Sequence, residues 1–165
     1  VRALTDIPMY IDDSSLITTA EIRSKARKMK IEHNVQAIFI DYLQFITGNS
    51  KLGSKQLEVA EISRDLKSLA KELEIPIITL AQLGRGPDAR IDHRPVLSDL
   101  RDSGAIEQDA DIVCFIYRDE YYNKDKSEKP GIGEIIIAKH RNGATTNVEV
   151  AWLAEYTRYD NKKHD

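Results

Sequence analysis

An apolar run that ends in a carboxylate is the feature of this sequence with the clearest chemical potential. Residues 35–40 are apolar at all but one position and show no alternation, which is typical of a strand buried on both faces of a parallel sheet. Asp41 follows the run directly, which gives it the form of a Walker B element. The Mg²⁺ of a nucleotide keeps several waters and needs only one or two carboxylates. From the run alone, a simpler role for Asp41 as a cap of the next loop stays open.

A second apolar segment, residues 77–80, leads to Gln82. Neighbouring parallel strands end at the same edge of a sheet, so we expect Gln82 to lie beside Asp41. An amide there could hydrogen-bond a γ-phosphate or a water molecule and pass on whether phosphate is present. A plain loop-anchoring role for Gln82 is the alternative.

The glycines at positions 48 and 53 have the separation of a phosphate-binding P-loop, but we reject that interpretation. The motif requires Lys directly after the second Gly and a hydroxyl after Lys, whereas Ser54 and Lys55 stand in the reverse order. We interpret this segment as a flexible loop. The sequence therefore predicts a nucleotide site without its phosphate cradle.

The elements that must position these residues alternate along the chain. Thr18 and Glu21 form a capping box that begins a helix running to about His33, and an amphipathic helix spans residues 54–74. Residues 84–94 form a long loop by their turn chemistry, and we expect that loop to be mobile. Three further strands are predicted at residues 112–117, 132–138 and 146–153. This order predicts an α/β fold with a doubly wound, mainly parallel sheet, helices on both faces and antiparallel strands at the C-terminal edge.

Composition sets wider bounds on the protein. The 165 residues predict one domain spanning 1–165, and 24 basic against 27 acidic residues neither indicate nor exclude a polyanionic partner. We find no membrane span and no signal peptide, and expect a cytoplasmic protein. Cys114 lies in an apolar run, so we expect a buried structural thiol. The four histidines lack metal-ligand spacing.

The sequence resembles the C-terminal half of the RecA-like motor domain of the DnaB family of hexameric replicative DNA helicases. Four stretches carry the resemblance, in this order: Asp41-Tyr42-Leu43-Gln44, Ala81-Gln82-Leu83, residues 99–111 (DLRDSGAIEQDAD) and Lys139-His140-Arg141-Asn142-Gly143. They cover nearly the whole chain. The block at 99–111 is the most diagnostic, because RecA-like ATPases in general share the strand-tip Asp but not this string.

The resemblance implies ATP and Mg²⁺ as cofactors, a ring of six identical subunits, and ATP-driven 5′ to 3′ movement along single-stranded DNA at the replication fork. It implies that Asp41 holds Mg²⁺, through water, and that Gln82 is the γ-phosphate sensor. Lys139 and Arg141 would be fingers that reach the nucleotide of the neighbouring subunit, worth about 10³-fold or more in rate. A primase and a helicase loader are the further partners implied.

The resemblance also implies a loop that contacts successive DNA phosphates. It places three residues there: Arg101, Asp102 and Gly104. Backbone contacts suit a motor, because it must grip every sequence alike. The preceding loop could add three basic side chains to the channel, partly offset by acidic neighbours: Arg85, Arg90 and Arg94.

Two positions depart from the family pattern, namely Ala81, where Ser is usual, and His140, where Gln is usual. The P-loop, the catalytic glutamate and the N-terminal primase-binding domain have no counterpart in this sequence, so we expect the fragment alone to be inactive. A non-enzymatic RecA-like module that binds DNA or a partner as a regulator is the alternative function. A recombinase or clock-type ATPase fits less well, because the string at 99–111 does not suit either.

Overall fold

The computed structural model describes residues 7–48 and 53–162, with the side chains of 101–103 left aside. The first part of the chain contains strands β1 (Ile17–Thr18), β2 (Ile38–Ile40), β3 (Ile46–Thr47) and β4 (Ile77–Thr79), and helices α2 (Thr19–His33) and α3 (Lys55–Leu73). The second part contains helices α4 (Gly104–Asp109) and α5 (Asp119–Asn123), and strands β5 (Ile112–Tyr117), β6 (Ile132–His140), β7 (Thr146–Leu153) and β8 (Arg158–Asn161). Short 3-10 turns connect them, among them η1 (Leu43–Phe45), η3 (Pro87–Ala89) and η4 (Leu97–Ser103).

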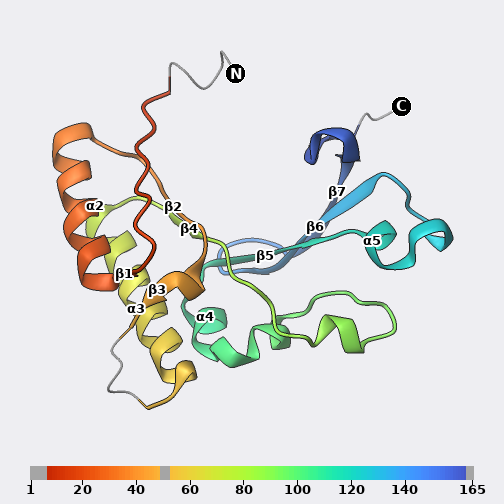
Figure 1. Cartoon of the computed structure of the whole chain (residues 1–165), viewed down its shortest axis with the longest axis horizontal. Coiled ribbons are helices and arrows are strands. Elements are labelled where there is room, and N and C mark those ends of the chain that lie inside the picture. Colours follow the sequence, from red (N-terminus) through yellow and green to blue (C-terminus); the bar gives the residue numbers. More distant parts are fainter. Residues whose placement is uncertain (1–6, 49–52, 163–165) are drawn as a thin grey trace.

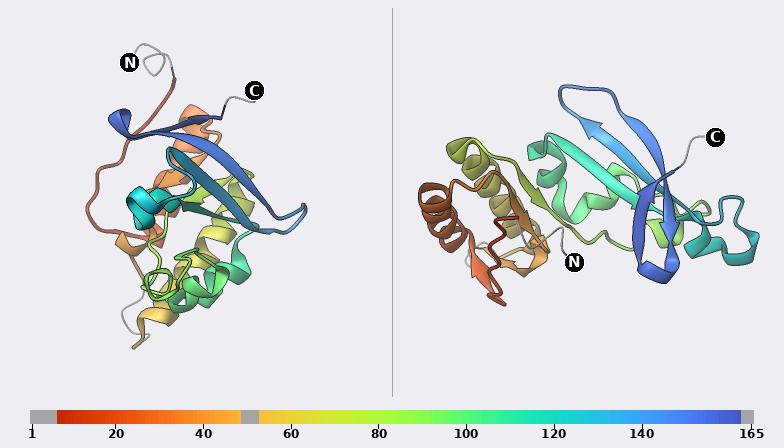
Figure 2. Two further views of the ribbon diagram at one scale, coloured as in Figure 1. Left: turned by 90° about the vertical axis from the view of Figure 1, so that its right-hand side faces the viewer. Right: turned by 90° about the horizontal axis from the view of Figure 1, so that it is seen from above.

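The described strands form parallel pairs in the first part of the chain and an antiparallel sheet in the second. β2 pairs with β4 and β1 pairs with β3, both in parallel, whereas β5, β6, β7 and β8 form an antiparallel sheet in that order. In Figure 1 the antiparallel strands extend to one side of helices α2 and α3. The hairpin that joins β6 to β7 projects from this sheet (Figure 2, right). The α/β class with antiparallel C-terminal strands is therefore confirmed.

Helix α3 organises the hydrophobic core. Its buried apolar side chains recur at helical spacing: Val59, Ile62, Leu66, Leu69 and Leu73. They share one cluster with Ile22 of α2 and with Phe115 of β5. The predicted capping box fixes the start of α2, since Glu21 N–H donates to Thr18 Oγ1 at 3.2 Å and Thr18 N–H donates to Glu21 Oε2 at 2.8 Å.

Strands β2, β4 and β5 are more buried on one face than on the other, which corrects the expectation from their apolar runs. Phe39 of β2 is 76% exposed and Ile78 of β4 is 40% exposed. Cys114 is exposed too, so the expected buried thiol is wrong. These exposed positions have one cause. Neighbouring residues along a strand point to opposite faces, and the described helices cover only the α3 side of the strands. No helix in the described part of the chain is both long and apolar enough to cross a membrane.

The core assignment predicts a difference between two leucines of the same helix. Leu69 is 1% exposed and Leu57 is 53% exposed. We expect Leu69→Ala to lower the free energy of unfolding by about 2–5 kcal/mol, because it leaves a cavity. Leu57→Ala should change it by about 0.5 kcal/mol or less. Urea unfolding of both variants measures this, and equal losses would contradict the proposed core.

Candidate functional site

Two parallel strand ends bring Asp41 and Gln82 to one place. Ile40 of β2 lies opposite Thr79 of β4, and Leu80 N–H donates to Ile40 O at 2.9 Å just beyond the strands. Asp41 and Gln82, both exposed, line one shallow hollow together with Tyr42, Leu80 and Ala81. The predicted juxtaposition is thus observed, while the chemical roles of the two side chains stay predictions.

Gln44 secures this arrangement, a role that the sequence did not reveal. Its Nε2 donates to Gln82 O at 3.1 Å, and Gln82 N–H donates to its Oε1 at 3.3 Å. A third bond runs from Leu43 N–H to Leu80 O at 2.9 Å. The turn η1 is therefore tied to the segment after β4, and the backbone of Gln82 is held beside Asp41. The only signal in the sequence was the place of Gln44 in the motif that begins with Asp41.

Lys139 and Arg141 lie at the C-terminal end of α4, outside the hollow of Asp41. Lys139 Nζ donates to the carbonyl oxygens of Glu107 and Gln108, the latter at 3.2 Å, and Arg141 Nη2 donates to Gln108 O at 3.2 Å. Cations suit the free carbonyl groups at a helix end. Arg141 also forms a 3.2 Å ion pair with Asp111.

Asp111 bridges this cluster to helix α3. Its carboxylate accepts a hydrogen bond from Lys67, and that bond, helped by Arg141, lowers the pKa of Asp111. Arg141 N–H also donates to Asp111 O at 2.8 Å. The start of β5 and the end of β6 are therefore joined to the core helix by charged contacts.

The expected DNA-contacting residues fall at the junction of η4 and α4. The backbone at Arg101 and Asp102 belongs to η4, but their side chains lie outside the described residues. Gly104 begins α4 and is exposed, and a Cβ there would meet no atom within 4 Å. The loop contact with DNA therefore stays a prediction.

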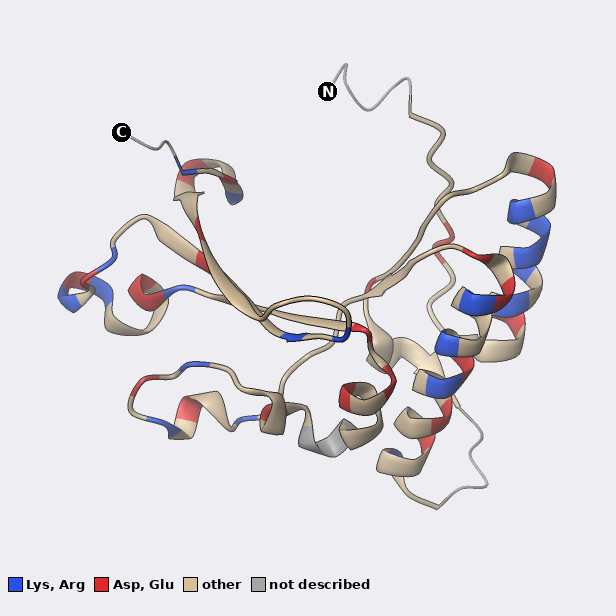
Figure 3. Ribbon diagram, turned by 180° about the vertical axis from the view of Figure 1, so that it is seen from behind, with Lys and Arg blue, Asp and Glu red and all other residues tan. Residues whose placement is uncertain are grey.

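The loop before η4 is held in place, which differs from the mobile loop that we expected. Arg90 Nη1 donates to Asp99 Oδ1 at 2.8 Å, and Arg90 Nη2 donates to Arg94 O at 2.6 Å. A Cβ on Gly86 would lie 2.3 Å from Asp99 Oδ1, so any other residue there would force the Asp99 side chain to move. Basic and acidic segments alternate along the loop (Figure 3). Arg85 is exposed at its start.

Arg94, predicted to face DNA, is bound within the protein. Its Nη1 and Nη2 donate to Glu134 Oε1 and Oε2 at 3.1 and 2.6 Å, and its guanidinium lies 4.7 Å from the centre of the Tyr117 ring. Glu134 is only 2% exposed, and Arg94 is the main cause that lowers the pKa of Glu134 to about 2. The DNA contact of Arg94 stays untested, but this geometry favours a structural role.

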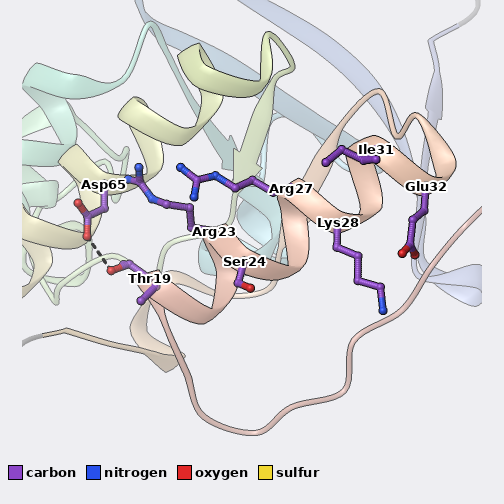
Figure 4. Close-up of a pocket in the computed structure, with 9 residues that line it drawn as sticks. Thr19, Arg23, Ser24, Arg27, Lys28, Ile31, Glu32 and Asp65 are labelled. Carbon is purple, nitrogen blue, oxygen red and sulfur yellow. Dashed lines mark hydrogen bonds between the residues drawn. The ribbon is translucent and has the colours of Figure 1, made fainter.

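A larger hollow lies elsewhere, along α2 (Figure 4). It has a volume of about 760 Å³, and its wall includes Thr19, whose Oγ1 donates to Asp65 Oδ2 at 2.6 Å. Arg23 and Arg27, which also line it, form ion pairs with Glu72 of α3. Residues of α2 and Asp65 of α3 line this hollow, away from the ends of β2 and β4, so the candidate nucleotide site remains the smaller hollow beside Asp41.

Comparison with known proteins gives consistent matches. The family described as "DnaB-like helicase C terminal domain" matches residues 1–161. Over 160 residues, 96% of this chain and 35% of each relative, the chain is 52% identical to the replicative DNA helicase DnaB of Geobacillus stearothermophilus and 51% identical to the replicative DNA helicase DnaC of Bacillus subtilis. The chain spans about a third of the length of these curated relatives.

Solved structures agree with these matches. One of them, described as an ATPase domain, is 41% identical, with a TM-score of 0.91, and the match covers 97% of this chain and 57% of that one. A second structure, titled "The Structure Of A DnaB-Like Replicative Helicase And Its Interactions With Primase", is 42% identical, with a TM-score of 0.87 over 93% of this chain and 37% of that one. These likenesses confirm the RecA-like fold class.

The buried carboxylate predicts a pH dependence of stability. A carboxylate whose pKa is lowered on folding stabilises the folded state above its unfolded pKa and loses that contribution as the pH falls through the folded pKa. For Glu134 the window runs from 4.5 down to about 2. We expect wild type to exceed Glu134→Gln in unfolding free energy by a constant amount above this window and by less within it.

Urea unfolding followed by the fluorescence of Trp152 measures this difference. Glu149→Gln is the matched control, because Glu149 is directly opposite Glu134 on β7 but is far less buried. Glu149→Gln should keep most of the wild-type pH dependence of the unfolding free energy. A wild-type advantage over Glu134→Gln that stays constant throughout the window would contradict the assignment.

Proposed function

The chain belongs to the DnaB-like helicase C terminal domain family, and from this premise we propose that it is part of a replicative helicase that couples ATP hydrolysis to movement along single-stranded DNA. The observation that carries the proposal is the shared hollow of Asp41 and Gln82 at the carboxyl ends of two parallel strands. Ligands of open α/β sheets bind at such an edge. The complete catalytic activity belongs to the whole protein, of which this chain supplies one part.

The residues at this edge fit a nucleotide with Mg²⁺. Asp41 offers an exposed carboxylate, and within the ranges that the structure describes no group of three or more His, Cys, Asp or Glu could hold a metal ion. Mg²⁺ at nucleotide sites uses one or two carboxylates, waters and the phosphates, so a single Asp is adequate. When bound, Mg²⁺ neutralises charge that develops on the phosphate oxygens during transfer.

Asp41 and Gln82 then take different tasks. We assign Asp41 to hold the hydrated metal ion and Gln82 to donate a hydrogen bond to the γ-phosphate or to a water molecule. The loop toward the DNA begins just after Gln82, so a change at this amide reaches the loop through the backbone. Gln44 fixes the backbone of Gln82 and leaves its side chain exposed at the hollow.

Lys139 and Arg141 act on a neighbouring subunit in this proposal. Their position outside the hollow of Asp41 supports action in trans, which requires a ring of subunits, here six. In the isolated chain their cationic groups rest on the carbonyl groups of α4, and the phosphates of the neighbour would replace those acceptors. Such fingers contribute about 10³-fold or more to the rate.

The DNA contact and the protein partners complete the proposal. Arg101, Asp102 and Gly104 contact phosphates of single-stranded DNA at the junction of η4 and α4, and Arg85 adds charge nearby. Primase is the proposed partner of the whole protein, supported by a structural relative whose title names interactions with primase. A loader protein and a cytoplasmic location are also proposed. The chain alone is expected to be inactive.

The role of Asp41 predicts a specific loss in the whole protein. Asp41→Asn should lower Mg²⁺ affinity or ATP hydrolysis by about 10–100-fold, as loss of a group that binds a metal through water does. Single-turnover hydrolysis over a range of Mg²⁺ concentrations measures it. Asp160→Asn, in the exposed part of β8, is the matched control and should behave as wild type. Unchanged hydrolysis by Asp41→Asn would remove the metal role and favour a non-enzymatic binding module.

The role of Arg101 predicts a change in the salt dependence of DNA binding. Each phosphate contact releases counterions, so Arg101→Ala should weaken single-stranded DNA binding and reduce the slope of log K against log salt by about 1. Fluorescence anisotropy with a labelled oligonucleotide at several salt concentrations measures both quantities. Arg158→Ala in β8 is the charge-matched control. An unchanged slope for Arg101→Ala would count against the assignment.

A further inference from the structure

Glu134 lies on an inner strand of the C-terminal sheet and accepts several hydrogen bonds from side chains. It accepts two hydrogen bonds from Arg94, one from Lys129 at 3.2 Å and one from Asn147. Its strand, β6, is paired on both sides, with β5 and with β7. A buried carboxylate in a doubly paired strand has little freedom to move. Glu134 can therefore hold the side chains of other segments in a fixed position.

Among the partners of Glu134, Arg94 of the loop contacts both carboxylate oxygens, whereas Lys129 and Asn147 contact one each. Glu149 stands directly opposite on β7, and two like charges in that position repel. Lys129 lies between them and donates to Glu149 at 2.7 Å as well as to Glu134. Glu149 also has a second cation, Lys162, whose Nζ donates to it at 2.7 Å. Glu134 shares Lys129 with Glu149, and Arg94 gives it a second positive charge. Removing Arg94 would leave the buried carboxylate of Glu134 with Lys129, which it shares with Glu149, and with the neutral Asn147.

Arg94 is held in orientation as well as in position. Its planar guanidinium matches both oxygens of Glu134 and lies over the ring of Tyr117, the cross-strand partner of Glu134 on β5. Tyr117 Oη also donates to Asp92 O of the same loop at 3.0 Å. The loop is thus joined to β5 and β6 immediately before η4 begins. The next charged anchor, Arg90 with Asp99, joins the loop to η4 itself.

We propose that Glu134 is a positioning residue for the DNA-contacting loop, acting through Arg94, and that Arg94 is not itself a DNA ligand. The inference rests on the proposed function, because it takes the junction of η4 and α4 as the DNA contact. Glu134 holds Arg94, Arg94 fixes the segment that enters η4, and Asp99 is held by Arg90 from the same segment. Strand β6 also ends at Lys139 and His140, so one strand holds both the loop and a proposed finger.

Glu134→Gln in the whole protein tests this, because positioning and simple electrostatics predict opposite signs. Removing a negative charge near a DNA site strengthens binding if only long-range charge matters. Loss of positioning weakens binding instead, by about 10-fold. We expect the weaker binding, with an unchanged salt slope and an unchanged affinity for a non-hydrolysable ATP analogue. Glu149→Gln, which shares Lys129 but not Arg94, should bind DNA as wild type.

Arg94→Gln and the double variant Arg94→Gln/Glu134→Gln complete the test. In the positioning role, Arg94→Gln weakens binding without changing the salt slope, and the double variant binds like each single variant. If Glu134→Gln alone does not fold, the double variant replaces it in the test, because it removes both charges of the Arg94–Glu134 ion pair together.

Four results would overturn the inference. The first is DNA binding by the double variant, or by a folded Glu134→Gln, that is as tight as in wild type or tighter. The second is a salt slope lowered by about 1 in Arg94→Gln, and the third is a loss of DNA affinity in the double variant that equals the sum of the two single losses. The fourth is a loss of affinity for the ATP analogue as large as the loss of DNA affinity. Arg101→Ala distinguishes failure of the Glu134 inference from failure of the proposed DNA contact. If Arg101→Ala weakens binding and the Glu134 variants do not, only the inference fails. If Arg101→Ala has no effect, the proposed DNA loop is wrong and the inference is wrong with it.

Discussion

The parallel pairing of β2 with β4 is the constraint on which the candidate site depends. Parallel strands must end at the same edge, so their register decides which residues meet beyond it. With Ile40 opposite Thr79, the chain places Asp41 and Gln82 in one hollow. A slip by one residue would turn one of these side chains to the other face of the sheet. Gln44 opposes that slip, because its side-chain amide forms hydrogen bonds with both the N–H and the carbonyl group of Gln82.

Local patterns predicted the parts of the fold that local physics controls. The capping box of Thr18 and Glu21, the amphipathic face of α3 and the strand ends at Asp41 and before Gln82 follow from spacing and residue type, and the structure agrees. The same patterns overstated burial. An apolar run shows that a strand can be buried on both faces, but the described helices cover only one, so Phe39 and Cys114 are exposed.

Long-range charge pairs could not be predicted from the sequence. Arg94 and Glu134 are far apart along the chain, and an arginine in a loop has the same local signature whether it binds DNA or a buried carboxylate. Glu134 itself gave no signal, because a single glutamate among isoleucines in β6 fits an exposed edge equally well. Only the packing of the loop against β5 and β6 decides between these roles. For the same reason, the hydrogen bonds of Lys139 and Arg141 to α4 had no counterpart in the motif.

These contacts together form a continuous connection between the two halves of the proposed chemistry. The segment from Gln82 leads through the anchored loop to η4 and α4, and the last carbonyl groups of α4 accept hydrogen bonds from Lys139 and Arg141. Because α4 is a short helix that directly follows η4, we expect a displacement of the proposed DNA-contacting junction to move those carbonyl groups or to break their bonds to the cations. A motor needs such a connection, since phosphate sensing, DNA grip and the action of the fingers have to change together. In the proposed function, side-chain hydrogen bonds between neighbouring elements provide this connection.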